Sequence, residues 1–138
     1  MRLLRYVRIF ADAAGETHFD EIELSMAPVN FAPPAPPLDS VSLGSATAVS
    51  LIGGDASWRG DAFHPAPARQ LMLFLRGGAA VTVSDGETRE LRTGEILLLE
   101  DADGRGHSTR LAGDTLVAVV RFGHEHAPDQ LPPGDRIG

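Results

Sequence analysis

Residues 64–77, HPAPARQLMLFLRG, and residues 94–109, GEILLLEDADGRGHST, carry most of the information about the fold. On a β-strand, residues of equal parity share one face. The first stretch therefore predicts a strand with two faces, Gln70, Met72 and Phe74 against Leu71, Leu73 and Leu75. Both faces are apolar apart from Gln70, so we expect burial on both sides of the strand. A buried amide without partners costs about 1–3 kcal/mol, so Gln70 is expected in a hydrogen-bond network or facing a cavity.

The rest of the chain repeats this pattern of short apolar stretches separated by Gly and Pro. Few windows hold the apolar spacing of an amphipathic helix, so little or no helix is expected. The stretches predict an all-β antiparallel barrel or sandwich. The predicted strands are Leu3–Phe10, Phe19–Met26, Ala46–Ile52, Gln70–Leu75, Ala79–Ser84, Thr88–Leu91, Glu95–Leu99, His107–Leu111 and Thr115–Phe122. Asp85-Gly86 predicts a type I′ hairpin turn.

Length and composition place the chain among single-domain globular proteins. One domain is expected over residues 1–138, with amino-terminal strands and a Pro-rich strap in 1–45, a barrel core in 46–122 and a flexible tail in 123–138. Within the first part, Phe31–Asp39 has four prolines and predicts an extended polyproline spacer or a strap over the barrel. His124-Glu125-His126 falls in the tail, where a solvated segment is expected rather than a metal site.

The charge and the missing residue types exclude several classes of function. The chain has no Cys, which excludes a disulfide scaffold, a cysteine–zinc site and a thiol enzyme. The net charge of −7 argues against nucleic acid as a partner. The longest apolar run, Ile96–Leu99, is too short to span a membrane. The first ten residues, MRLLRYVRIF, have Arg at three positions and form no secretory apolar segment, so a cytoplasmic protein is expected.

Two histidines stand at the spacing of a known pair of motifs. The first motif is His-x-His, three or four residues, Glu, six residues and Gly, and the chain has His64, Ala66, Gln70 and Gly77 at those places. The second ends in Pro-x-Gly-x-x-His, which reads here as residues 102–107 with Ala in place of Pro. In these motifs the chain resembles the cupin superfamily, and as a whole it is similar to a small bacterial single-domain cupin with an RmlC-like β-barrel. The resemblance implies an antiparallel double-stranded β-helix, or jelly-roll barrel.

The resemblance also implies a metal site. In metal-binding cupins three His and one Glu hold a divalent ion, which implies a site for Fe, Mn, Ni or Zn at His64, Gln70 and His107. The chain has Ala66 for one His and the neutral Gln70 for the Glu, so the attraction for a cation is weaker. The resemblance therefore implies a metal-dependent oxygenase or isomerase acting on a small organic molecule. The alternative is a metal-free barrel in which the same three residues hydrogen-bond a small molecule. No organic cofactor is expected.

Four further residues are candidates for contact with a substrate. Met72 and Phe74 share the face of Gln70 and are expected to line the pocket with Trp58, which otherwise is a core or rim aromatic residue. Glu100 is the candidate general base if it faces inward, and part of a solvated acidic turn if it faces outward.

The leucine face of the strand that begins at Gln70 predicts a homodimer.

Overall fold

The computed structural model describes residues 2–123 and 136–137, and these residues form strands and no helix. The predicted all-β class is therefore confirmed. The strands are β1 (Leu3–Ala11), β2 (Thr17–Ser25), β3 (Ala27–Val29), β4 (Leu38–Ser40), β5 (Ala46–Gly54), β6 (Arg59–His64), β7 (Gln70–Arg76), β8 (Gly78–Val83), β9 (Thr88–Arg92), β10 (Ile96–Glu100), β11 (His107–Leu111), β12 (Thr115–Phe122) and β13 (Arg136–Ile137). With no helix in the part of the chain described, none there has the length and apolar character needed to cross a membrane.

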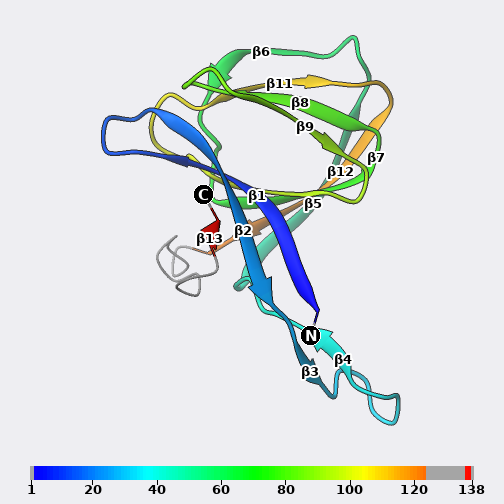
Figure 1. Ribbon diagram of the computed structural model, residues 1–138. Helices are drawn as coiled ribbons and strands as arrows, with labels where there is room; N and C mark the ends of the chain where they lie inside the picture. Colours follow the sequence, from blue (N-terminus) through cyan, green and yellow to red (C-terminus); the bar gives the residue numbers. More distant parts are fainter. Residues whose placement is uncertain (1, 124–135, 138) are drawn as a thin grey trace.

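Two sheets face each other and form the body of the molecule (Figure 1). The larger sheet has the order β13-β2-β1-β10-β7-β12-β5, and the smaller has the order β6-β11-β8-β9. The pairing is antiparallel with one exception, the parallel pair of β1 with β10. We expect a wholly antiparallel arrangement from the sequence, and this one pair departs from it. β1 and β10 are far apart in the chain, separated by β2 to β9, so no hairpin forces them to be antiparallel.

The alternation along β7 and β10 explains why both strands are apolar on both faces. One face of the larger sheet meets the smaller sheet in a core cluster that contains Phe74, Leu97 and Leu99. The other face carries a second cluster, to which Leu71 and Leu98 belong. Successive residues of one strand thus enter different clusters, as the period of two requires.

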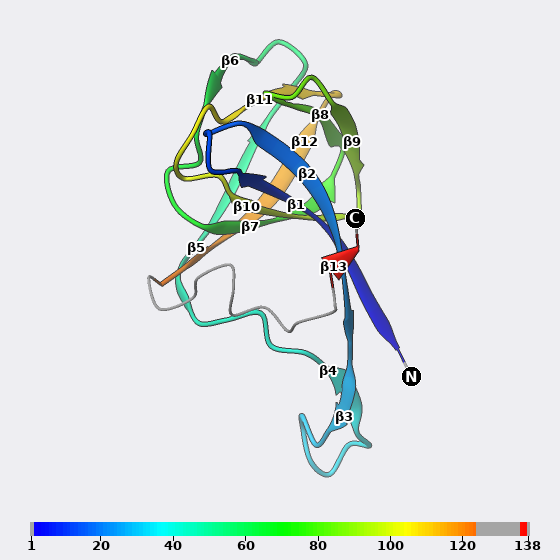
Figure 2. The same cartoon turned by 60° about the vertical axis from the view of Figure 1, so that its left-hand side comes forward.

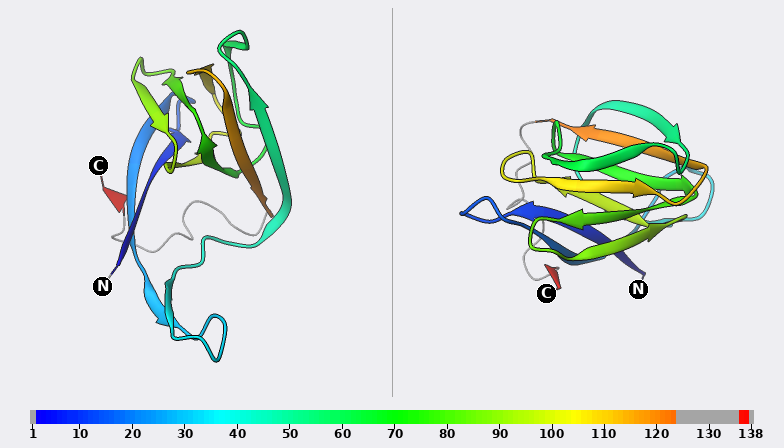
Figure 3. Two further views of the ribbon diagram at one scale, coloured as in Figure 1. Left: turned by 90° about the vertical axis from the view of Figure 1, so that its right-hand side faces the viewer. Right: turned by 90° about the horizontal axis from the view of Figure 1, so that it is seen from above.

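The Pro-rich segment does not cover the barrel. β3 and β4 pair with each other in a two-stranded sheet, and residues 30–37 form the connection between them. Figures 2 and 3 show this hairpin projecting away from the two sheets. The expectation of a strap over the barrel is therefore wrong, because β3 and β4 satisfy their backbone groups with each other and not with the barrel strands.

Two other local expectations are corrected. β6 was not predicted, because Arg59, Gly60 and Asp61 interrupt any apolar pattern in an edge strand whose residues are mostly exposed. The turn at Asp85-Gly86 is not type I′, since that turn needs a positive φ at both central residues and only Gly86 has one. The predicted flexible tail lies largely outside the described residues, including His124-Glu125-His126. Arg136 and Ile137 pair with β2.

Candidate functional site

A cavity of about 300 Å³ lies between the two sheets. Six of the residues singled out from the sequence line it together: His64, Gln70, His107, Trp58, Met72 and Phe74. The other lining residues are Ile52, Gly53, Ala66, Pro67, Ala79, Leu99, Thr109, Leu111, Thr115 and Val117. The parity argument for β7 therefore places Gln70, Met72 and Phe74 on the correct face of the strand.

His107 is a buried polar residue of this cavity, with 4% of its surface exposed. Its Nδ1 lies 2.7 Å from Oδ2 of Asp101, which is completely buried. An ionised carboxylate only accepts hydrogen bonds, so the Nδ1 atom of His107 carries the hydrogen and donates it. The Nε2 atom, on the other side of the ring, is then the nitrogen available to a ligand in the cavity.

His64 faces the same cavity from the end of β6. β6 and β11 pair so that His64 stands opposite His107, and the two ring centroids are 5.0 Å apart. The Nδ1 atom of His64 lies 3.1 Å from the carbonyl oxygen of Pro65. A carbonyl only accepts, so His64 also donates from Nδ1 and keeps Nε2 free for a ligand.

Gln70 completes the polar end of the cavity. It begins β7 and is buried, with 7% of its surface exposed. Its amide nitrogen lies 4.0 Å from the sulfur of Met72, a weak contact that leaves the amide oxygen available. The sequence-based expectation that this amide faces a cavity agrees with its position.

The three residues fit a divalent ion in one respect and depart in another. Metal-binding histidines usually donate their second N–H to a carboxylate or a carbonyl, and both histidines do so here. Two imidazoles that share one ion through Nε2 have centroids about 4.6–5.3 Å apart, which includes the observed 5.0 Å. The departure is that the described residues contain no group of three His, Cys, Asp or Glu side chains arranged to hold a metal. The third donor is the neutral Gln70.

Close backbone packing positions His64 against β11. Gly106 precedes His107 and has a φ of +79°, and a Cβ atom there would lie 2.1 Å from the carbonyl carbon and oxygen of His64. The carbonyl oxygen of Gly106 accepts a 2.6 Å hydrogen bond from the hydroxyl of Thr17, which is completely buried. The approach of the two histidines therefore depends on a residue without a side chain.

Glu100 does not line the cavity. Its side chain is 1% exposed and forms ion pairs of 2.5 Å with Arg8 and 2.7 Å with Arg69. Arg8 is also 3.2 Å from Asp20. Glu100 is thus neither near His107 as a general base nor in a solvated turn, because it has the parity of Leu98 and faces the second cluster.

Asp101 was missed by the sequence reasoning, although the sequence carries a signal for it. Leu97 and Leu99 belong to the core cluster between the sheets, and Asp101 continues their parity by one step beyond β10. The same parity argument that turns Glu100 away from the cavity turns Asp101 toward it. An acidic residue of that parity, six residues before His107, is placed so that its carboxylate can reach the imidazole ring of His107.

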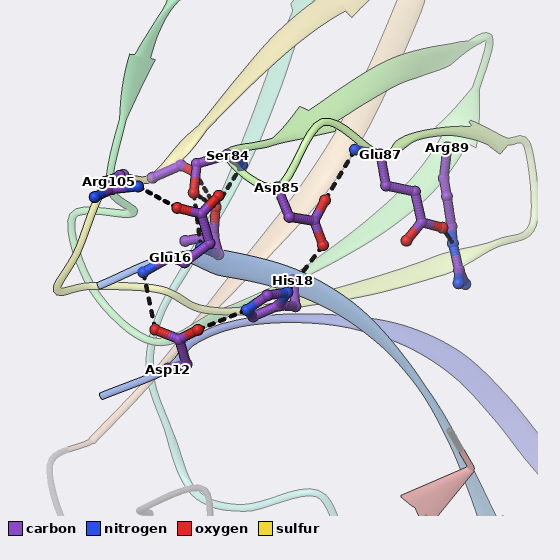
Figure 4. A network of polar contacts seen from close by, with 10 residues as sticks. Asp12, Glu16, His18, Ser84, Asp85, Glu87, Arg89 and Arg105 are labelled. Carbon is purple, nitrogen blue, oxygen red and sulfur yellow. Dashed lines mark hydrogen bonds and ion pairs between the residues drawn. The ribbon is translucent and has the colours of Figure 1, made fainter. Parts of the chain in front are cut away.

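A second histidine cluster lies outside the cavity, where the β1–β2 turn meets the β8–β9 turn (Figure 4). His18 contacts Asp12 through Nε2 at 2.8 Å and Asp85 through Nδ1 at 2.9 Å. The hydrogen bond with Asp12, followed by that with Asp85, raises the pKa of His18. The hydrogen bond from His18 lowers the pKa of Asp12, and that from the backbone of Glu87 lowers the pKa of Asp85. The three side chains are partly exposed, and the cluster joins two turns.

The chain has a structural likeness to a protein of known structure. No family model matches the chain, and no curated protein matches it. Among solved structures, a candidate ethanolamine utilization protein Q from Salmonella typhimurium LT2 superposes with a TM-score of 0.43 at 14% identity. The match covers 88% of this chain and 98% of the other.

Proposed function

We propose that the protein is a small cupin that binds a small organic molecule in the cavity between its two sheets. The observation that carries the proposal is the convergence of His64, Gln70 and His107 at one end of a mostly apolar cavity. These are the positions that the motif resemblance assigns to ligands. A cavity of about 300 Å³ is at the lower end of the range for small-molecule sites.

In the first form of the proposal, His64, Gln70 and His107 hold a divalent ion such as Fe, Mn, Ni or Zn. The support is the donor set, because both histidines keep Nε2 free while Nδ1 is bound to an oxygen. A bound ion supplies Lewis-acid or oxygen chemistry, as in an oxygenase or isomerase. The chain itself orients the His107 ring through Asp101.

A cobalt titration tests the metal site without any substrate. The chain is used without a tag, stripped of metal, and with His124 and His126 replaced by Ala to remove competing imidazoles. We expect one cobalt ion to bind per chain, with visible absorption that reports nitrogen ligands. His107→Ala and His64→Ala abolish this signal, and the control His18→Gln keeps it. Failure to saturate at one ion per chain overturns the metal site.

In the second form of the proposal, the barrel binds its ligand without a metal. The observation that favours this form is the uncharged Gln70, which offers a cation no compensating charge. Ala66 likewise lines the cavity where the motif has a second His. In this form His107→Ala weakens binding of the organic ligand and leaves the metal content unchanged at zero. The cobalt titration therefore decides between the two forms.

A further inference from the structure

The cavity has a polar end and an apolar end. On β7 the cavity-facing residues run from Gln70 through Met72 to Phe74, and on β11 they run from His107 through Thr109 to Leu111. Strand pairing sets Val117 beside Phe74 and Ala79 beside Leu111. The end opposite His107 is therefore made of Phe74, Ala79, Leu111 and Val117.

The side chains of Phe74, Ala79, Leu111 and Val117 offer no hydrogen-bond group to a ligand. Thr115 lies there, but its hydroxyl is within 3.0–3.3 Å of backbone atoms of Gly78 and Gly113, and the residue is 1% exposed. Thr115 thus presents its methyl group. A polar group placed at this end loses its water and gains no partner.

No carboxylate or guanidinium lines the cavity among the described residues. Asp101 lies behind the ring of His107 and is hydrogen-bonded to it. The buried Arg8 and the partly buried Arg69 are paired with Glu100 on the other side of the larger sheet. A charged ligand would therefore enter the cavity without a compensating charge, which favours an uncharged one.

The polar end accepts hydrogen bonds more than it donates them. His64 and His107 each donate from Nδ1 to the protein, so a neutral ring offers the lone pair of Nε2. The amide oxygen of Gln70 is a third acceptor. A head group with one O–H donates a hydrogen bond to one of these acceptors, whereas an ether donates none.

We propose that the cavity binds an uncharged amphiphile with one hydroxyl head at His64 and His107 and an apolar body that reaches Phe74 and Leu111. The four steps along the strand from Gln70 to Phe74 correspond to about 13 Å. The volume corresponds to roughly 10–15 non-hydrogen atoms. The inference rests on the small-molecule binding proposed above, in its metal-free form, in which the Nε2 atoms of His64 and His107 hold no ion.

Four probes separate the features of this ligand. They are para-butylphenol, which has the hydroxyl head and the apolar body; para-butylanisole, which lacks the O–H; para-butylbenzoate, which is charged; and phenol, which lacks the body. Calorimetry is carried out on the full chain in excess EDTA. We expect para-butylphenol to bind at least tenfold more tightly than each of the other three. Equal or tighter binding of the anisole or the benzoate overturns the inference.

Variants at the two ends locate the binding. Ala79→Leu fills the apolar end, so para-butylphenol loses at least tenfold in affinity while phenol binding is unchanged. Leu111→Phe fills the same end from a half-buried position and replaces Ala79→Leu if that variant does not fold. The control Leu75→Ala, on the outer face of β7, leaves all affinities unchanged. The inference is overturned if para-butylphenol binds both Ala79→Leu and Leu111→Phe with unchanged affinity, or if no probe binds at all. Neither outcome changes the conclusion of the cobalt titration.

Discussion

At the scale of single residues, the contact between His107 and Asp101 determines what the cavity can do. The buried carboxylate fixes which ring nitrogen carries hydrogen and holds the ring in one orientation. Without it the ring is free to turn or to change tautomer, and Nε2 is no longer presented to the cavity. Asp101 is therefore a positioning residue, since it touches His107 and does not line the cavity.

Asp101→Asn tests this role with little change in volume. The amide removes the charge that holds the Nδ1–H tautomer, so we expect cobalt affinity to fall about 10- to 100-fold. Visible absorption is expected to shift as well, because the ligand field changes with the ring orientation. The control is Asp103→Asn, in the same loop and exposed, which leaves affinity unchanged. Unchanged cobalt affinity in Asp101→Asn contradicts the positioning role.

The pKa of His18 gives a prediction for stability against pH. Hydrogen bonds with Asp12 and Asp85 raise the pKa above its ordinary value of 6.5 in the folded state. Protonated His18 therefore stabilises the fold fully below about pH 6.5, and this contribution is lost as the pH rises through the raised folded value. Denaturant unfolding at pH 5.5 and pH 9 is the measurement. We expect His18→Gln to destabilise the protein more at pH 5.5 than at pH 9.

The carboxylates provide the control for His18. Asp85→Asn removes one of the two carboxylates that accept hydrogen bonds from His18. At pH 5.5, His18→Gln is therefore expected to lower the free energy of unfolding by less in the Asp85→Asn protein than in the unaltered protein. Asp12 and Asp85, whose pKa values are lowered, lose their own contribution only toward acid pH, below the range compared. An equal effect of His18→Gln at both pH values is the result that contradicts this assignment.

At the scale of elements, the junction of β6 and β11 depends on Gly106. The positive φ alone costs an alanine about 1–2 kcal/mol, and a Cβ there would also overlap the backbone of His64. We expect Gly106→Ala to destabilise the protein by more than that and to weaken both cobalt and para-butylphenol binding. Urea unfolding and calorimetry are the measurements. Gly86→Ala is the matched control, since Gly86 also has a positive φ but has nothing within 4 Å. Equal effects of the two substitutions contradict the argument.

The ion pairs of Glu100 join three parts of the larger sheet. Arg8 comes from β1, Glu100 ends β10, and Arg69 precedes β7. Glu100→Gln leaves Arg69 without its carboxylate and Arg8 with Asp20 alone, which costs about 3–5 kcal/mol in urea unfolding. Ligand and cobalt binding are expected to remain, because the side chain lies outside the cavity. The control is Glu90→Gln, an exposed pair with Arg92 that contributes about 0.2–1 kcal/mol. Lost cobalt binding with unchanged stability would restore Glu100 as a site residue.

At the scale of the whole molecule, strand periodicity predicted the all-β class and most of the strands. It placed Gln70, Met72 and Phe74 on one face because a buried strand must alternate. It did not predict β6, whose polar residues are exposed at a sheet edge, nor the parallel contact of β1 with β10, which depends on the path of the whole chain. The side of the sheet to which Glu100 points also could not be predicted from the sequence. Alternation assigns the residues of β10 to two faces but does not show which face encloses the cavity.

The homodimer remains a prediction. On the leucine face of the larger sheet, the structure shows which residues are exposed and could form the interface. Leu71 is 6% exposed and belongs to the second cluster, whereas Leu75 is 50% exposed. The apolar row continues from Leu73 through Ala118 to Leu51, which is 64% exposed. β5 ends the sheet in the part of the chain described, and it carries no charge.

An exposed apolar edge strand without charge is a site for strand pairing, because two copies of β5 bring no like-charged side chains of the strand together. We expect sedimentation velocity to give a dimer for the unaltered chain and a monomer for Leu51→Glu, which places a carboxylate of each copy in the interface. The control is Leu38→Glu, since Leu38 is 58% exposed but lies on the projecting β3–β4 hairpin, and this variant stays dimeric. A monomeric unaltered chain contradicts the homodimer, and a dimer that persists in Leu51→Glu contradicts the assignment of its interface to β5.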